Sequence, residues 1–186
     1  LGQEASEGLD TASAKLDIDT EIIPLPVGIS ATDRYIEKLS DLSGKRIPEC
    51  LKKERQRAID LILEHHPKFY NLKAALICDA DISVPFAEFL SEIGIKVVFS
   101  CPGYAQPSFV SRMEKAVKSS EEKCLIMPEG DCYDLEEFLE DNKVDLIFGN
   151  SRGKILAKKF DAPLIRIGFP ITDRDMAYLD PLCGYK

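Results

Sequence analysis

The sequence predicts an α/β fold, a Rossmann-like or flavodoxin-like parallel sheet of about five strands with helices on both faces, preceded by two helices. From residue 71 onward, short apolar runs of strand length alternate with longer amphipathic segments of helical period. Glycine, proline or polar pairs separate these segments, as expected at the turns of βα units. Strand–helix alternation at this spacing implies crossover connections, so the strands are expected to be parallel.

The expected strands and helices follow one another along residues 73–167. The strands are expected at residues 73–78, 96–100, 124–127, 144–148 and 164–167, and the helices at residues 82–93, 107–118, 132–142 and 151–159. In the strand at 144–148, β-forming apolar residues make a short run that Gly149 and Asn150 end. Pro163 prevents the last helix from continuing, so a new strand follows it.

Residues 21–70 are expected to form a helical lead-in. Residues 21–25 are a short β-prone run, and Gly28 leads into residues 30–33, a Ser-Ala-Thr-Asp sequence that predicts a capped helix start. Gly44 is expected to end this helix and Pro48 to open a second one. The face of the second helix is marked by Leu51, Arg55, Ala58, Leu61 and Ile62.

The domain organisation predicted from these patterns has three parts. Residues 1–20 are acidic and rich in small residues, with one weak helix over residues 4–16, and are expected to be the remnant of a preceding element. Residues 21–70 form the helical lead-in, and residues 71–186 form the parallel α/β domain.

Composition excludes several classes of protein. The 186 residues are 45% apolar and 30% charged, the profile of a globular protein. A net charge of −8 argues against a general nucleic-acid or anionic-membrane surface, because both partners need a basic face. No apolar run approaches the roughly 20 residues that span a bilayer, and the acidic start does not resemble a signal peptide. A cytoplasmic location is expected, with no nucleic-acid and no membrane partner.

The six cysteines are expected to be thiols without a metal or catalytic role. They contain no C-x-x-C pair, and His65 and His66 are adjacent rather than spaced as a metal-binding pair. Cys78 and Cys101 each follow a predicted strand at the carboxyl edge, where ligands of open α/β sheets bind, but we favour buried, inert thiols. No catalytic triad is visible, so the sequence predicts neither catalytic nor metal-ligating residues.

One turn is the candidate ligand site. It comprises Gly149, Asn150, Ser151, Arg152, Gly153 and Lys154, between a predicted strand and a basic helix. A phosphate or nucleotide there would be bound by the N–H groups of Ser151, Arg152 and Gly153, with Lys154 or Arg152 closing over it. The spacing matches neither the P-loop nor the dinucleotide fingerprint, and the structural alternative is a tight turn that Ser151 caps.

Acidic residues follow two other predicted strands. Asp79 and Asp81 could bind a ribose or a metal, but they also suit a βα turn and a helix cap, which we favour. The Glu-Gly-Asp turn at residues 129–131 has the same two interpretations.

A family resemblance is carried by residues 25–66, 73–94 and 144–174 and by the final Gly-Tyr-Lys. In these segments the chain resembles the nitrogenase component 1 family, in the form of its β-type subunit. The motifs occur in order. They are Gly-Ile-x-Ala-Thr-Asp at 28–33, an Arg-rich second helix, Gly-Asn-Ser-x-Gly-Lys at 149–154, and Pro-Leu-Ile-Arg-Ile-Gly-Phe-Pro-Ile-x-Asp-Arg at 163–174. This branch includes the molybdenum–iron protein β subunit and its homologue in the scaffold complex for the iron–molybdenum cofactor.

The resemblance implies a subunit of an iron–sulfur-cluster oxidoreductase for nitrogen fixation, or of the cofactor scaffold. Its partners would be a homologous α-type subunit, in an α2β2 complex, and an ATP-driven iron protein as electron donor. The parent complex would hold iron–sulfur clusters and an iron–molybdenum-type cofactor. None of the six cysteines in this chain matches a cluster-ligand position of the family, so no cofactor is expected in this chain. The chain is expected to be an inactive piece of a longer subunit; a phosphate- or nucleotide-binding module and a cluster-free subunit-interaction domain remain alternatives.

Overall fold

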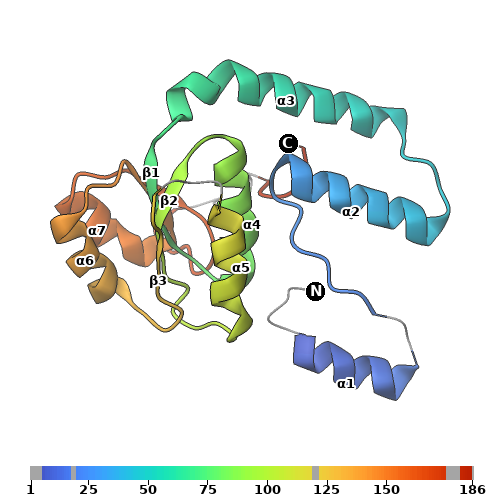
Figure 1. Cartoon of the computed structure of the whole chain (residues 1–186), viewed down its shortest axis with the longest axis horizontal. Coiled ribbons are helices and arrows are strands. Elements are labelled where there is room, and N and C mark those ends of the chain that lie inside the picture. Colours follow the sequence, from blue (N-terminus) through green and yellow to red (C-terminus); the bar gives the residue numbers. More distant parts are fainter. Residues whose placement is uncertain (1–5, 18–19, 119–121, 175–180, 186) are drawn as a thin grey trace.

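A five-stranded parallel sheet forms the centre of the computed structural model, which describes residues 6–17, 20–118, 122–174 and 181–185 (Figure 1). The strands are β1 (Lys73–Ile77), β2 (Lys96–Ser100), β3 (Leu125–Ile126), β4 (Leu146–Gly149) and β5 (Leu164–Arg166). Their spatial order is β3-β2-β1-β4-β5, and every neighbouring pair is parallel. The predicted α/β fold class is therefore confirmed, and the strand order reverses direction between β1 and β4.

Two layers of helices cover the sheet. The helices are α1 (Ser6–Leu16), α2 (Gly28–Ser43), α3 (Glu49–Phe69), α4 (Ala80–Glu92), α5 (Ser108–Val117), α6 (Cys132–Asp141) and α7 (Lys154–Lys159). Helices α4 and α5 lie on one face, and α6 and α7 on the other (Figure 1). Since side chains of a strand alternate between faces, Ala74 and Leu76 pack toward α4 and α5, whereas Ala75 and Ile77 pack toward α6 and α7.

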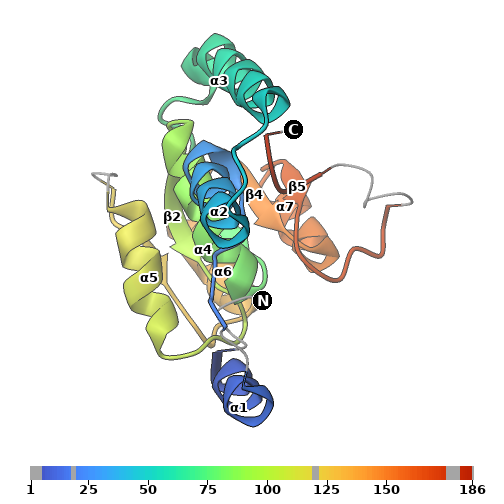
Figure 2. The ribbon, with the colours of Figure 1, turned by 90° about the vertical axis from the view of Figure 1, so that its right-hand side faces the viewer.

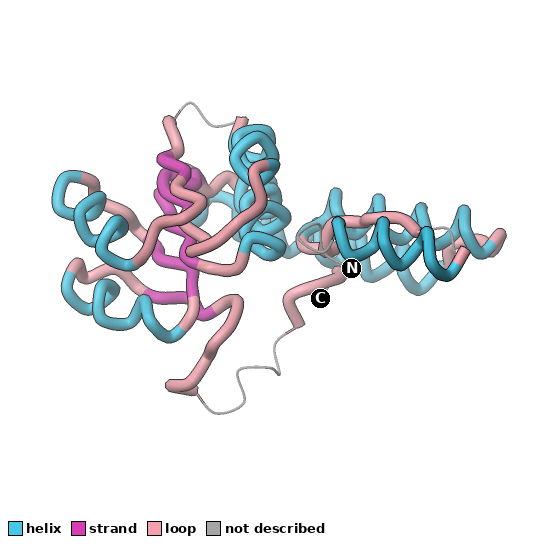
Figure 3. The backbone as a smooth tube through the Cα atoms, turned by 90° about the horizontal axis from the view of Figure 1, so that it is seen from below, coloured by secondary structure: helices cyan, strands magenta, loops and turns pink. Residues whose placement is uncertain are grey.

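Helices α2 and α3 lie outside the α4–α5 layer. Figure 2 shows α2 over α4, with which it packs, and Figure 3 shows the helical pair extending away from the sheet. Helix α3 has no fully buried residue among its 21. Its inner face contributes Ala58, Leu61 and Ile62 to an open apolar groove of about 270 Å³, whose other side includes Phe86 and Phe89 of α4.

The predicted strands and helices are present from residue 73 onward, and their ends differ from the prediction by at most two residues, except at residue 151. There the predicted helix begins with a separate 3-10 turn, Ser151–Gly153, and α7 follows it. Gly44 ends α2 with a φ of 65°, as expected. The β-prone run at residues 21–25 is not a strand, because it has no neighbouring strand with which to pair.

Two predicted helix caps are wrong. Helix α2 begins at Gly28 rather than after residue 30, and the Glu92 carboxylate of α4 accepts hydrogen bonds from the N–H groups of Ile29 and Ser30, both at 2.9 Å. A distant carboxylate thus replaces the local cap. Ser151 does not cap the turn after β4 either, because Asn150 Oδ1 accepts the hydrogen bond from the Arg152 N–H.

Candidate functional site

The candidate site is the carboxyl edge of the sheet between β1 and β4, where the strand order reverses. Open α/β sheets bind ligands in the crevice that forms at such a reversal. Cys78 and Asp79 follow β1, whereas Gly149 is the last residue of β4 and Asn150 follows it. Here the segment after β5, residues 168–173, lies across this crevice; we call it the crevice segment.

Main-chain groups of the crevice segment are bound from both strands. The Phe169 N–H donates to Asp79 Oδ2 at 3.1 Å, and the Phe169 carbonyl accepts from Asn150 Nδ2 at 3.2 Å. The Ser151 N–H donates to the Pro170 carbonyl at 3.1 Å. Asp79, Asn150 and Ser151 at the reversal are therefore each bound to the crevice segment.

Gly168 permits this close approach. Its φ is +75°, a conformation that side chains rarely adopt, and a Cβ there would lie 3.0 Å from Asp79 Oδ2 and 3.1 Å from the Cys78 Cβ. Gly149 has another reason to be glycine, since its φ is not positive and a Cβ there would lie 2.6 Å from the Ile77 carbonyl oxygen. A side chain at Gly149 would require the Ile77 backbone to move, and one at Gly168 would be strained by the positive φ.

A cluster of charged side chains fixes the far end of the crevice segment. The Asp173 carboxylate accepts hydrogen bonds from Arg166 Nε at 2.8 Å, Arg166 Nη2 at 2.5 Å and Ser151 Oγ at 2.6 Å. Lys154 Nζ lies 3.7 Å from Asp173 Oδ2, and Ser151 Oγ accepts from the Thr172 N–H at 2.8 Å. The side chains of Arg166 and Asp173 are only 12% and 17% exposed.

The charges of this cluster stabilise one another. The hydrogen bonds from Arg166 and then from Ser151 hold the pKa of Asp173 well below its usual value of 3.8. The bond to Asp173 in turn raises the pKa of Arg166. The pair is therefore ionised throughout the neutral pH range.

The structure places the predicted ligand-binding turn beneath this segment. The three N–H groups expected to bind phosphate have acceptors within the chain: Ser151 N–H donates to the Pro170 carbonyl, Arg152 N–H to Asn150 Oδ1 at 3.0 Å, and Gly153 N–H to the Asn150 carbonyl at 3.2 Å. These bonds support the structural alternative for the turn. Phosphate binding there stays a prediction.

The acidic residues predicted as caps divide into two kinds. Asp131 caps α6 by accepting from the N–H groups of Tyr133 and Asp134, and Asp134 accepts from the Asp131 N–H, so the cap interpretation is confirmed there. Asp79 precedes α4 but makes no side-chain cap bond, because its carboxylate binds Phe169 instead.

The thiols at the carboxyl edge are buried. Cys78 is 3% exposed and Cys101 1% exposed, and burial raises the pKa of Cys78 to about 12 and also raises that of Cys101. Within the described residues, no group of three His, Cys, Asp or Glu side chains is arranged to hold a metal ion.

A second polar cluster, which sequence reasoning missed, connects α2, α3 and the end of the chain. Arg55 of α3 binds both carboxylate oxygens of Asp33 through Nε, at 2.8 and 2.9 Å, and the Tyr185 hydroxyl donates to Asp33 Oδ1 at 2.5 Å. The sequence contains two signs of this cluster. Asp33 ends the Gly-Ile-x-Ala-Thr-Asp motif, and Arg55 lies among apolar residues on one face of its predicted helix.

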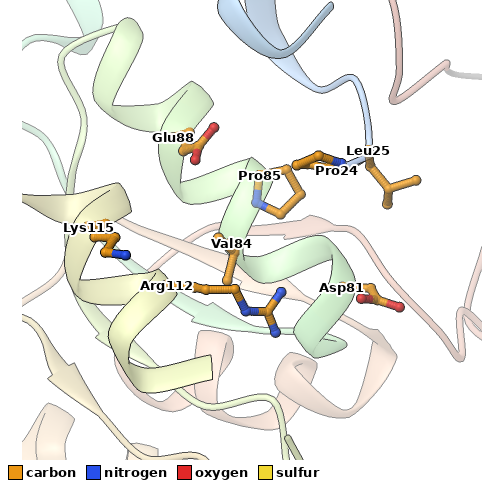
Figure 4. Close-up of a pocket in the computed structure, with 8 residues that line it drawn as sticks. All are labelled: Pro24, Leu25, Asp81, Val84, Pro85, Glu88, Arg112 and Lys115. Carbon is orange, nitrogen blue, oxygen red and sulfur yellow. The ribbon is translucent and has the colours of Figure 1, made fainter. Parts of the chain in front are cut away.

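Figure 4 shows a small pocket on the outer side of α4 and α5. Its volume is about 140 Å³, and it is lined by Pro24, Leu25, Asp81, Val84, Pro85, Glu88, Arg112 and Lys115. Arg112 extends beside Val84 in the direction of Asp81 (Figure 4). Glu88, at the border of the pocket, is paired with Arg34 at 2.8 Å. No helix in the described part of the chain is long and apolar enough to cross a membrane.

Comparisons with known proteins identify relatives along the whole chain. The model of the family described as nitrogenase component 1 type oxidoreductase matches residues 2–186. The nitrogenase molybdenum-iron protein beta chain of Clostridium pasteurianum is 33% identical over 192 residues, covering 100% of this chain and 41% of the relative. That of Bradyrhizobium diazoefficiens is 36% identical, covering 87% and 32% respectively. The vanadium-iron protein beta chain of Trichormus variabilis is 30% identical, covering 92% and 39%.

The fold agrees with that of a solved relative. The structure of nitrogenase Cp1 at pH 6.5 matches with a TM-score of 0.91 and 30% identity, over 97% of this chain and 40% of that one. The chain thus spans roughly two fifths, or less, of the length of the relatives it matches. Since the family model covers nearly every residue, the chain belongs to the nitrogenase component 1 type oxidoreductase family.

Proposed function

We propose that the chain is part of a β-type nitrogenase component 1 subunit and serves there as a structural and subunit-contacting α/β domain. The observation that carries this proposal is the similarity to proteins named nitrogenase beta chains along the whole chain. The filled crevice supports the same proposal, since the chain's own residues bind the polar groups at the strand reversal. We keep the division into residues 1–20, 21–70 and 71–186 as part of the proposal.

The proposed parent complex is an α2β2 assembly with a homologous α-type subunit, in the cytoplasm, that receives electrons from an ATP-driven iron protein. The names of the relatives imply metal clusters in such a complex, and we propose iron–sulfur clusters and an iron–molybdenum-type cofactor. No group of three His, Cys, Asp or Glu side chains among the described residues is arranged to hold a metal ion, and we propose that other parts of the complex supply the cluster ligands.

A cofactor-assembly scaffold is the second candidate within the family. The two functions differ in what the full-length protein does with its metal: an oxidoreductase keeps its cofactor and reduces substrate, whereas a scaffold releases the cofactor to another protein. The deciding experiment is anaerobic purification of the full-length protein with its α-type partner, followed by measurement of ATP-dependent substrate reduction with an iron protein.

Iron content of this chain alone tests the proposed division of labour. The chain purified without oxygen is expected to lack stoichiometric iron and visible cluster absorption, whereas the full-length complex is expected to have both. Stoichiometric iron in the chain alone would contradict the structural role and point to the carboxyl-edge cysteines. A saturable shift in stability with inorganic phosphate would instead favour the phosphate-binding alternative.

A further inference from the structure

The charged cluster at Asp173 has the donor set of an oxyanion-binding site. A guanidinium group contributes two hydrogen bonds, at 2.5 and 2.8 Å, from Arg166 on β5. The Ser151 hydroxyl, from the turn after β4, contributes a third at 2.6 Å, and the Lys154 ammonium lies 3.7 Å away. Bidentate guanidinium with a hydroxyl and an ammonium is the combination that proteins use to bind carboxylate and phosphate groups.

The low exposure of Arg166 favours an anion at this position. The Arg166 side chain is only 12% exposed, and its Nη1 reaches no closer than 3.5 Å to the Leu164 carbonyl, so the Asp173 carboxylate supplies its short hydrogen bonds. A mostly buried guanidinium without an anion is strongly unfavourable, because its lost hydration is not replaced. The fold is therefore expected to be more stable with a carboxylate in this site than without one.

We propose that Arg166, Ser151 and Lys154 form a binding site for a small carboxylate, and that Asp173 is the tethered occupant of this site. The tethered carboxylate latches the crevice segment over the β1–β4 reversal. The site is built by β5 and by the turn after β4, whereas its occupant is carried by the loop that follows β5. A free carboxylate can therefore replace Asp173 when residue 173 no longer provides one.

The Asp173 carboxylate also restrains the crevice segment. Between Phe169 and Asp173, the crevice segment is fixed at one end by Asp79 and Asn150 and at the other by the carboxylate site. Loss of the latch frees the second end, and the hydroxyl of Ser151 also loses the alignment that lets it accept from the Thr172 N–H. All of these contacts lie within this chain, so the latch is expected whether the parent protein is an oxidoreductase or a scaffold.

Chemical rescue of the full chain tests the proposal. In sodium chloride, Asp173→Ala is expected to lower the melting temperature by about 5 °C or more, since the variant leaves Arg166 without an anion. Replacing chloride with sodium formate at equal ionic strength is expected to restore at least half of that loss, with saturable dependence on formate. The wild-type chain, whose site is filled, is expected to melt alike in the two salts.

The double variant Arg166→Gln, Asp173→Ala is the matched control, because it lacks the guanidinium that binds formate. Equal effects of formate on the single and double variants, or no advantage of formate over chloride, would overturn the proposal. An Asp173→Ala chain as stable as wild type would overturn it as well. Asp173→Ser, which retains a hydroxyl, is the second variant if Asp173→Ala fails to fold in chloride. Folding of either variant in formate supports the site, and failure of both in formate refutes it.

Discussion

At the scale of single residues, Asp33 holds the lead-in helices and the end of the described chain together. Tyr185→Phe removes only the hydroxyl that donates to Asp33 and is expected to lower the free energy of unfolding by about 1–2 kcal/mol, the usual cost for a hydrogen bond to a charged acceptor. Denaturant unfolding measures this loss. Tyr133→Phe is the control, since Tyr133 is 79% exposed and its change should fall within about 0.5 kcal/mol. Equal effects of the two variants would contradict the role of Asp33.

The same carboxylates give the chain an acid-sensitive part of its stability. Burial alone would raise the pKa of Asp33, but the hydrogen bonds from Arg55 and Tyr185 lower it below 3.8, and those from Arg166 and Ser151 lower the pKa of Asp173. Both carboxyl groups have a lower pKa in the folded state than in the unfolded state. Their contribution to the free energy of unfolding is therefore complete above the unfolded-state pKa and is lost as pH falls through the folded-state pKa.

Thermal melts between about pH 5 and pH 2 should show this loss. The melting temperature of wild type is expected to fall more steeply with acid than that of the variant Asp33→Asn, Asp173→Asn, whose two amides do not titrate. Parallel pH profiles for the two proteins would show that neither pair contributes to acid sensitivity.

The thiols should divide by burial when they are alkylated. Cys50 and Cys183 are exposed and are expected to react first with iodoacetamide at neutral pH. Cys78 and Cys101 are expected to react only after unfolding, because burial shields both and raises their pKa values. Mass spectrometry of the time course measures the order. Modification of Cys78 at the rate of Cys50 would mean that the carboxyl edge opens in solution.

The sequence predicted the position of the candidate turn but not its partner. Gly149 and Ser151 stand out because they separate an apolar strand from a helix. Asp173 lies 22 residues after Ser151, and nothing local indicates that its carboxylate returns to that hydroxyl. Charged pairs between distant loops depend on how the strands are ordered in space, which no periodicity in the sequence encodes.

At the scale of elements, the β1–β4 pair depends on the lack of a side chain at Gly149. Gly149→Ala would bring a Cβ to 2.6 Å from the Ile77 carbonyl, a backbone atom that cannot rotate away. The variant is expected to lose about 1–3 kcal/mol of unfolding free energy, the cost typical of overpacking. Denaturant unfolding is the measurement.

Gly8→Ala is the control for this substitution, because no atom lies within 4 Å of a Cβ at Gly8 and the residue is inside helix α1. It is expected to change stability little or to increase it, as alanine favours helix. Equal stability of the Gly149 and Gly8 variants would show that β1 and β4 can separate enough to admit a methyl group.

Elements with strong periodicity could be predicted from the sequence, and those defined by distant contacts could not. Strand β2 occupies residues 96–100 as predicted, since its apolar run has turns at both ends. The run at 21–25 has similar residues but no neighbouring strand, and β-propensity alone does not produce a strand. The predicted start of α2 was wrong because the residue that caps the helix, Glu92, lies more than 60 residues away in the sequence.

At the scale of the whole molecule, parallel strands were predictable because a helix separates each apolar run from the next. The order β3-β2-β1-β4-β5 was not, since alternation alone permits several orders. That order decides where the crevice lies and explains why residues far apart in the sequence meet there. The family resemblance of the sequence suggested the proposed function. The contacts of the crevice segment across the β1–β4 reversal could be seen only in the structure.

The least buried large element is α3, and its dynamics provide a test of how the chain is used. None of its residues is fully buried, Leu61 and Leu63 are 59% and 66% exposed, and Arg55 binds it to Asp33. Elements with few buried apolar contacts open locally at low free energy. Amide hydrogens of α3 are therefore expected to exchange at least about tenfold faster than those of β1, in the chain alone.

In the full-length protein with its α-type partner, exchange in α3 is expected to slow markedly, because an interaction domain covers such a surface with neighbouring parts of the assembly. Helix α4 is the internal control: seven of its residues are buried in the chain alone, so its exchange should change little. Slow exchange in α3 of the isolated chain would mean that the Asp33 cluster alone holds the helix. Unchanged, fast exchange in the assembly would exclude α3 as a contact surface and direct the search to the carboxyl edge.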